Sequence, residues 1–201
     1  SVAEIMEYGA AIVSLRPFGD VDVVGGFDTL EAYTKDTSNQ GAIVGRVANR
    51  IENARFEIDG KVYLLADNDN GNCLHGGVGF QHRLWKIVDY TENSITLCYL
   101  SPDGEDGFPA NLQIDVSYTL KDAAIIISYT ATPDGKTPIA LTNHAFFNLD
   151  GFGGDIKEHT VQIWADSYSE VNNKLIPTGN HPNVIGTPLR SSNRTKLHQP
   201  R

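Results

Sequence analysis

The sequence predicts an all-β fold, an antiparallel β-sandwich, from two observations. Hydrophobic residues recur with a period of two along much of the chain, which is the repeat of strands that bury one face. The candidate strands are short, they follow one another roughly every ten residues, and Gly, Asn and Asp separate them. Many short strands divided by turn residues are typical of a sandwich or barrel.

The clearest strand is predicted over residues 112–120, where apolar residues at the even positions alternate with mostly polar residues at the odd ones. Lys121-Asp122 reads as a turn into the isoleucine-rich segment 123–130, so these two strands are expected to form a hairpin. Asp59-Gly60 and Thr91-Glu92-Asn93 predict two further hairpins. Their strands are expected at 56–58 with 62–65, and at 83–90 with 94–100.

The remaining elements are weaker in sequence. Further strands are expected at 10–16, 21–24, 42–47, 139–142 and 160–165. One short helix is expected over 29–35, with Asp28 or Thr29 as its N-cap. We interpret residues 1–186 as one domain and the polar, basic segment 187–201 as a disordered tail.

Composition excludes several classes of protein. The 201 residues carry a net charge of −9, which disfavours nucleic acid as a partner. No apolar run approaches the roughly 20 residues that span a bilayer, so we expect no membrane association. The two cysteines form no CxxC pair, and we predict free thiols and no metal site. With no targeting signal visible, a cytoplasmic location is expected.

The candidate binding and catalytic residues lie in four polar segments at predicted strand ends. They contain Arg, Asn, His and aromatic residues, which suit the binding of a neutral polyol through hydroxyl contacts and ring stacking. The segments are GRVANRI (45–51), LHGG (74–77), DGEDGFPANL (103–112) and NHAFFNL (143–149).

Each segment also has a plainer interpretation. Arg46 and Arg50 could lie on one concave strand face or could pair with surface carboxylates. His75 could be a hydrogen-bonded turn residue, and His144 a satisfied core histidine. The acids of the 103–106 segment could form a catalytic carboxylate pair, but crowded loop acids are expected to point into solvent.

In this order and spacing, the four segments resemble the galactose mutarotase (aldose 1-epimerase) family. The resemblance extends to DVVGGFDTLEAY (22–33), Trp85, ADSY (165–168) and LIPTG (175–179), and covers the chain to about residue 187. It implies the family's β-supersandwich fold. It also implies interconversion of the α and β anomers of free aldohexoses such as galactose and glucose, without a cofactor.

The resemblance also implies roles for single residues. His144 is expected to be the general acid that protonates the ring oxygen during ring opening. Asn49, Arg50 and His75 are expected to bind the sugar, and Phe146 to line the cleft, at a position where the family often has tyrosine. No metal is implied.

The family's general base, a glutamate near its C-terminus, and a sugar-binding aspartate in a later strand have no counterpart in this sequence. The sandwich is therefore expected to lack C-terminal strands. Residue type is the only argument for Glu158 or Glu170 as a replacement base. The alternative to an active epimerase is a truncated relative that binds sugar without turnover; the sequence leaves the oligomeric state open.

Overall fold

The structure, a computed structural model, describes residues 1–122, 124–187, 189 and 195–196. The chain divides into two compact units, Ser1–Phe147 and Asn148–Arg201, each of which is described by itself. Strands and loops make up nearly all of both units, as predicted. No helix in the described ranges has the length and apolar character needed to cross a membrane.

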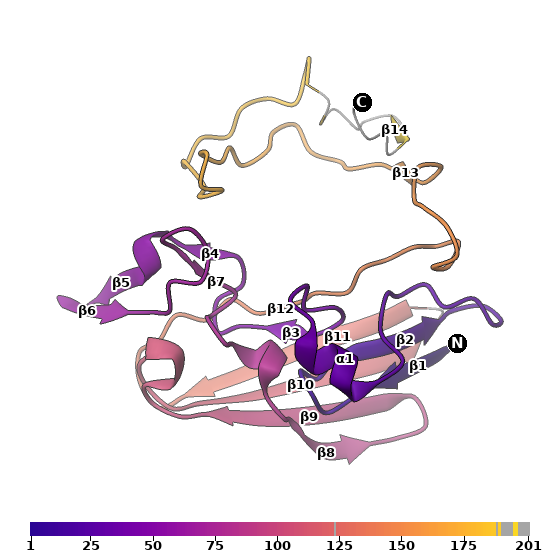
Figure 1. Ribbon diagram of the computed structural model, residues 1–201, viewed down its shortest axis with the longest axis horizontal. Coiled ribbons are helices and arrows are strands. Elements are labelled where there is room, and N and C mark those ends of the chain that lie inside the picture. Colours follow the sequence, from indigo (N-terminus) through magenta and orange to yellow (C-terminus); the bar gives the residue numbers. More distant parts are fainter. Residues whose placement is uncertain (123, 188, 190–194, 197–201) are drawn as a thin grey trace. The chain divides into compact units, whose positions relative to one another are not determined.

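The first unit is built on a four-stranded antiparallel meander (Figure 1). Its strands are β8 (Lys86–Tyr90), β9 (Ser94–Ser101), β10 (Leu112–Lys121) and β11 (Ala124–Pro133), in the spatial order β11-β10-β9-β8. The register of β10 on β11 runs without a break from Leu112↔Pro133 to Lys121↔Ala124. Both hairpins predicted in this region are confirmed.

The even-numbered face of β10 forms the centre of the core. Leu112, Ile114 and Val116 are fully buried, and they share one hydrophobic cluster with Trp85 and Phe80. Burying one such side chain stabilises the fold by about 1.5–3 kcal/mol, so this face supplies much of the driving force. The odd-numbered side chains of β10 are not buried, which is the alternation that the sequence predicted.

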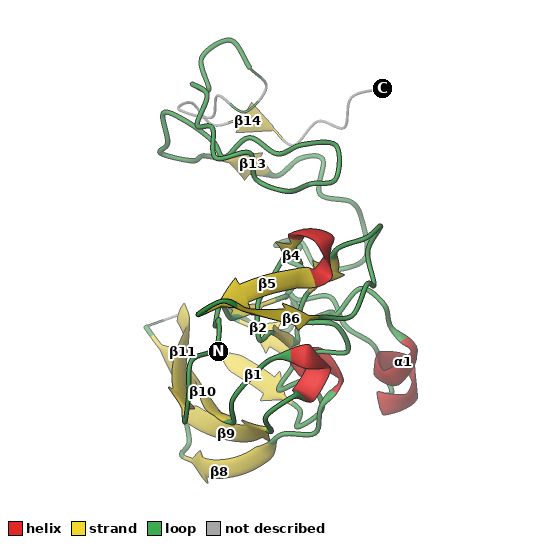
Figure 2. Ribbon diagram, turned by 90° about the vertical axis from the view of Figure 1, so that its left-hand side faces the viewer, coloured by secondary structure: helices red, strands yellow, loops and turns green. Residues whose placement is uncertain are grey.

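Smaller elements complete the first unit (Figure 2). β1 (Val2–Ile5) pairs with β2 (Ile12–Arg16), and the β5 (Arg55–Ile58)–β6 (Lys61–Leu64) hairpin turns at Asp59-Gly60 as predicted. Helix α1 (Leu30–Lys35) is capped by Thr29, whose Oγ1 accepts from Ala32 N at 3.2 Å. Thr29 is therefore the N-cap of the two candidates.

Two very short strand pairs hold the loops that carry the candidate site residues. β4 (Arg50–Ile51) pairs with β7 (Cys73–Leu74), and β3 (Ile43–Val44) pairs with β12 (Thr142–Asn143). Three 3₁₀ turns lie between these elements. They are η1 (Glu52–Ala54), η2 (Phe80–His82) and η3 (Glu105–Gly107).

The strand predicted at 21–24 is absent, and only Val24 forms a bridge, to Phe147. The reason lies in Asp22, whose Oδ1 accepts from the backbone N–H of Leu15 at 2.9 Å and of Val24 at 3.1 Å. A side chain thus occupies donors that a strand ladder would use. The strand predicted at 42–47 is likewise shortened to β3.

In the second unit, the strand predicted at 160–165 is reduced to β13 (Thr160–Val161), which pairs with β14 (Thr195–Lys196). Most of the predicted tail 187–201 lies outside the described residues, so its disorder stays a prediction.

Candidate functional site

The structure brings the predicted site residues of the first unit together from three distant segments. Arg50 begins β4, His75 follows β7, and His144 follows β12. The imidazole rings of His75 and His144 meet edge to face, with centroids 5.1 Å apart and planes at 83°. The ring of Phe146 lies 5.3 Å from that of His144. Two histidines and an aromatic ring therefore share one surface with Asn49 and Arg50.

Asn49 and His75 hold each other in a fixed orientation. The amide N–H of His75 donates to the carbonyl of Asn49 at 2.9 Å, and the amide N–H of Asn49 donates to Nδ1 of His75 at 3.1 Å. Because Nδ1 is the acceptor, the neutral imidazole carries its proton on Nε2. His75 therefore offers Nε2–H as a hydrogen-bond donor.

The electrostatics of His75 favour this neutral form. Burial lowers the pKa of His75 below its ordinary value, and the neighbouring His144 and Arg50 lower it further. Asp69 acts in the opposite direction. Because the pKa of His75 lies below the ordinary value of 6.5, the ring is mostly neutral at pH 7 and can act as an uncharged hydrogen-bond donor.

Arg50 is held at two of its nitrogens. Nε lies 2.6 Å from Oδ2 of Asp69, and a terminal nitrogen donates to Oδ1 of Asn49 at 3.1 Å. A guanidinium has five N–H donors, and the other three have no partner among the described residues. These free donors suit the hydroxyl oxygens of a polyol.

His144 has a fixed backbone and a free ring. Its N–H donates to the carbonyl of Ala42 at 2.8 Å, and its carbonyl accepts from Gly41 N at 3.1 Å. The side chain is half-buried, and no described residue makes a hydrogen bond to either ring nitrogen. The alternative of a satisfied core histidine is therefore wrong, and the ring is available to exchange a proton with a ligand.

Comparisons with known proteins identify the family of the chain. The family model for aldose 1-epimerase matches residues 1–201. The chain belongs to the aldose 1-epimerase family. The galactose mutarotase of Bos taurus is 44% identical over 190 residues, which are 92% of this chain and 55% of that protein. The aldose 1-epimerase of Escherichia coli is 40% identical over 192 residues, with 92% and 56% covered.

Solved structures show the same fold. A GalM/aldose epimerase homologue from C. elegans superimposes with a TM-score of 0.90 at 36% identity, over 97% of this chain and 62% of that one. Galactose 1-epimerase from Lactobacillus acidophilus, at 24% identity and a TM-score of 0.87, supports the fold alone. The chain spans about half the length of the curated relatives it matches.

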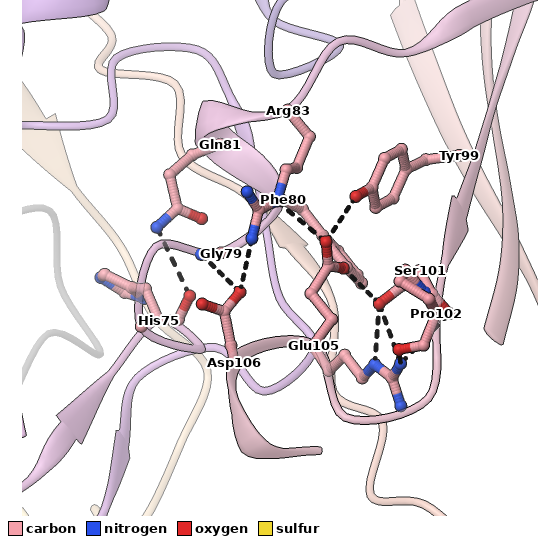
Figure 3. A network of polar contacts seen from close by, with 12 residues as sticks. His75, Gly79, Phe80, Gln81, Arg83, Tyr99, Ser101, Pro102, Glu105 and Asp106 are labelled. Carbon is pink, nitrogen blue, oxygen red and sulfur yellow. Dashed lines mark hydrogen bonds and ion pairs between the residues drawn. The ribbon is translucent and has the colours of Figure 1, made fainter. Parts of the chain in front are cut away.

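In this aldose 1-epimerase family member, Glu105 and Asp106 of the acidic loop 103–106 do not point into solvent (Figure 3). Glu105 and Asp106 have side chains only 12% and 13% exposed, and Arg83 bridges them, with Nε 3.2 Å from Glu105 Oε1 and a terminal nitrogen 3.0 Å from Asp106 Oδ2. Tyr99 and Ser101 both donate to Glu105. The expectation of outward-pointing acids is therefore wrong for these two residues, because the half-buried Arg83 forms ion pairs with both.

This network reaches the site through the loop that carries His75. Asp106 Oδ2 accepts from the amide of Gly79 at 3.2 Å, and the side chain of Gln81 donates to the carbonyl of His75 at 3.5 Å (Figure 3). Because both carboxylates are occupied by donors, they serve as supports for the loop rather than as an acid/base pair. The catalytic-carboxylate alternative is wrong as well.

Both interpretations of Arg46 are also wrong. Its side chain is 2% exposed, and it does not lie beside Arg50 on a strand. The guanidinium donates instead to five oxygens, which come from the end of β9, the β9–β10 connection and the loop after β11, and none of them belongs to a carboxylate. Arg46 is thus a structural residue that ties the β9–β10 connection to the site.

Asp69 and Asn68 belong to none of the sequence motifs that predict the site. Asn68 accepts from the amide of Leu74 at 2.7 Å and donates to its carbonyl at 3.0 Å, next to His75. The Asn70-Gly71 pair between them and β7 is a strong hairpin signal that could have located this turn.

The two glutamates named as replacement bases lie in the second unit. Glu170 is exposed, and its carboxylate accepts from Thr178 Oγ1 at 2.8 Å and from Asn180 Nδ2 at 2.9 Å. The hydrogen bond from Asn180 lowers the pKa of Glu170 most, and that from Thr178 lowers it further. The lowered pKa makes Glu170 a weaker base. Glu158 has a partner of its own. Among the described residues, no group of three or more His, Cys, Asp or Glu is arranged to hold a metal.

Proposed function

We propose that this protein is an aldose 1-epimerase, interconverting the α and β anomers of free aldohexoses such as galactose and glucose. The observation that carries the proposal is the contact of His75 with His144 beside Asn49 and Arg50. The similarity to a mutarotase and an epimerase supports the same reaction.

In this proposal the residues have separate roles. His144 protonates the ring oxygen as the hemiacetal opens and takes the proton back as the ring closes on the other face. An imidazole suits this exchange because its ring nitrogens can both donate and accept a proton. Arg50, Asn49 and the fixed Nε2–H of His75 hold the hydroxyls, so that the ring oxygen stays aligned with the acid. The exposed ring of Phe146 stacks on the apolar face of the sugar.

The acid half of the reaction is the part that this geometry supports. A base must also remove the proton of the anomeric hydroxyl. The carboxylate that contacts Arg50 belongs to Asp69, and it is already engaged in the ion pair with that residue. A small-molecule aldose as partner, the absence of nucleic acid and a cytoplasmic location remain predictions.

Polarimetry tests the proposal. Purified protein, shown by circular dichroism to be folded, is added to freshly dissolved α-galactose, and the optical rotation is followed against a buffer blank. We expect faster mutarotation, and we expect His144→Ala to abolish the acceleration while the folded signal is kept.

Two other outcomes are informative. Retained turnover in the His144→Ala variant would exclude His144 as the acid. A folded protein that binds galactose in a calorimetric titration but does not accelerate mutarotation would favour the sugar-binding relative. Neither binding nor acceleration would overturn both functions.

A further inference from the structure

We propose that Asp69 is a positioning residue for sugar binding. It orients the guanidinium of Arg50 so that the free donors of this side chain face the ligand. The inference rests on the proposed function, because Arg50 is taken as a sugar-binding residue. It adds a residue to which neither the motifs nor the comparisons assign a role.

The contact between the two side chains is suited to orientation. Asp69 Oδ2 meets Nε of Arg50 at 2.6 Å, so the three free donors are all on the two terminal nitrogens. The side chains are 18% and 20% exposed, so water screens the pair less than it screens a surface pair. An arginine has about 2 kcal/mol of rotamer entropy to lose on binding, and a fixed Nε removes part of that cost beforehand.

Asp69 can hold Arg50 because its own backbone is fixed. Residues 69–72 form a two-residue hairpin in which Asp69 and Asn72 exchange both backbone hydrogen bonds, at 3.1 and 3.0 Å. The central residues Asn70 and Gly71 have φ of 54° and 88°, as a type I′ turn requires. The side chain of Asn72 is fully buried, and its Oδ1 accepts from Asn53 N.

The second contact of Arg50 completes the orientation. One terminal nitrogen donates to Oδ1 of Asn49, whose backbone is bonded to His75. Two points of attachment fix the plane of the guanidinium, whereas one would leave it free to rotate. Asp69, Arg50, Asn49 and His75 are thus a continuous chain from the hairpin to the ring that offers Nε2–H.

The test is Asp69→Asn, which keeps the shape of the side chain and removes its charge. We expect affinity for equilibrated galactose, measured by calorimetry, to fall roughly tenfold, about the effect of losing one charge-assisted hydrogen bond. Asp67→Asn is the matched control. Asp67 lies in the same turn and caps Gly71 N at 2.9 Å, but it does not contact Arg50, so this variant should bind galactose as the unaltered protein does.

A double-mutant cycle separates positioning from a loss of structure. In an Arg50→Lys background, which lacks Nε, Asp69→Asn should weaken binding by less than twofold. A full tenfold loss in that background would show that Asp69 does not act through Arg50 and would overturn the proposal.

A measurement without sugar keeps this inference separate from the proposed function. The ¹⁵Nε–H signal of Arg50 should show a rigid side chain in the unaltered protein and a mobile one in Asp69→Asn. An unchanged signal would overturn the positioning role even if galactose binds. If the unaltered protein neither binds nor turns over galactose, the proposed function fails, and the ¹⁵Nε–H signal still decides whether Asp69 holds Arg50.

Discussion

Replacing Arg46 by lysine should destabilise the first unit although the charge is kept. The guanidinium donates to five acceptors, namely Ser101 O, Ser101 Oγ, Pro102 O, Pro109 O and Thr137 Oγ1. An ammonium group has only three donors, so at least two of these oxygens lose the bond to residue 46. Pro102 O would keep the backbone N–H of Glu105, so at least one oxygen is left without a donor.

The size of the effect follows from this count. Each buried polar group left without a partner costs about 1–3 kcal/mol, so Arg46→Lys should lower the free energy of unfolding by at least about 1–3 kcal/mol. For a domain of this size, 1 kcal/mol corresponds to about 2–4 °C in Tm. The expected fall in Tm is therefore at least about 2 °C.

Thermal and urea denaturation followed by circular dichroism would measure this change. Arg55→Lys is the control, because Arg55 is an exposed residue of β5 and its replacement should change the stability by less than about 0.5 kcal/mol. Equal stability of the two variants would refute the reasoning, since it would mean that the buried oxygens do not need the guanidinium fork.

Two further predictions concern the loop that carries His75. Gly76→Ala should cost more stability than Gly60→Ala in urea denaturation and should weaken galactose binding. Both glycines have φ near 80°, but an added Cβ at Gly76 would lie 2.1 Å from the carbonyl of Gly45, whereas Gly60 has open space; equal losses would contradict this. Galactose affinity should stay constant from about pH 8 to 6.5 and fall below that. The pKa of His75 is lower in the folded protein than in the unfolded chain, so the unfolded chain binds more protons below about pH 6.5. The free energy of unfolding therefore also falls as the pH drops through the folded pKa of His75. Protonated Nδ1 would then face the N–H of Asn49. Titration of the His75 ring by NMR gives its pKa, and a value above 6.5 would exclude this explanation.

The sequence predicts the meander well because one rule governs it. Ile114 and Val116 are buried and Gln113 is exposed, so the alternation of apolar and polar residues predicts which face of the sheet is buried. Asp59-Gly60 is also read correctly, because the left-handed backbone of its turn needs such residues.

The site could be predicted only in part. His75 and His144 were found through their motifs, but nothing in the sequence gives the contact between their rings. β4 and β7 have two residues each, too few for any periodicity. Arg46 and Glu105 are charged residue types that usually lie at the surface, so the sequence does not predict their burial. The partner of Arg46 at Ser101 is more than fifty positions away in the chain, and Glu105 pairs with a second arginine, Arg83.

The stage of folding at which the site forms depends on the pairing of β3 with β12. This pairing joins Ile43 to Asn143 and so encloses one hundred residues of chain. Closing a flexible loop of that length costs about 4 kcal/mol of entropy, more than a two-residue ladder supplies. Once the meander is packed on β3, the loop still to be closed runs only from Pro133 to Thr142, and the cost falls to about 2 kcal/mol. We therefore expect His144 to reach His75 only after the sheet has formed, so that the imidazole pair depends on residues of the meander, outside the candidate site.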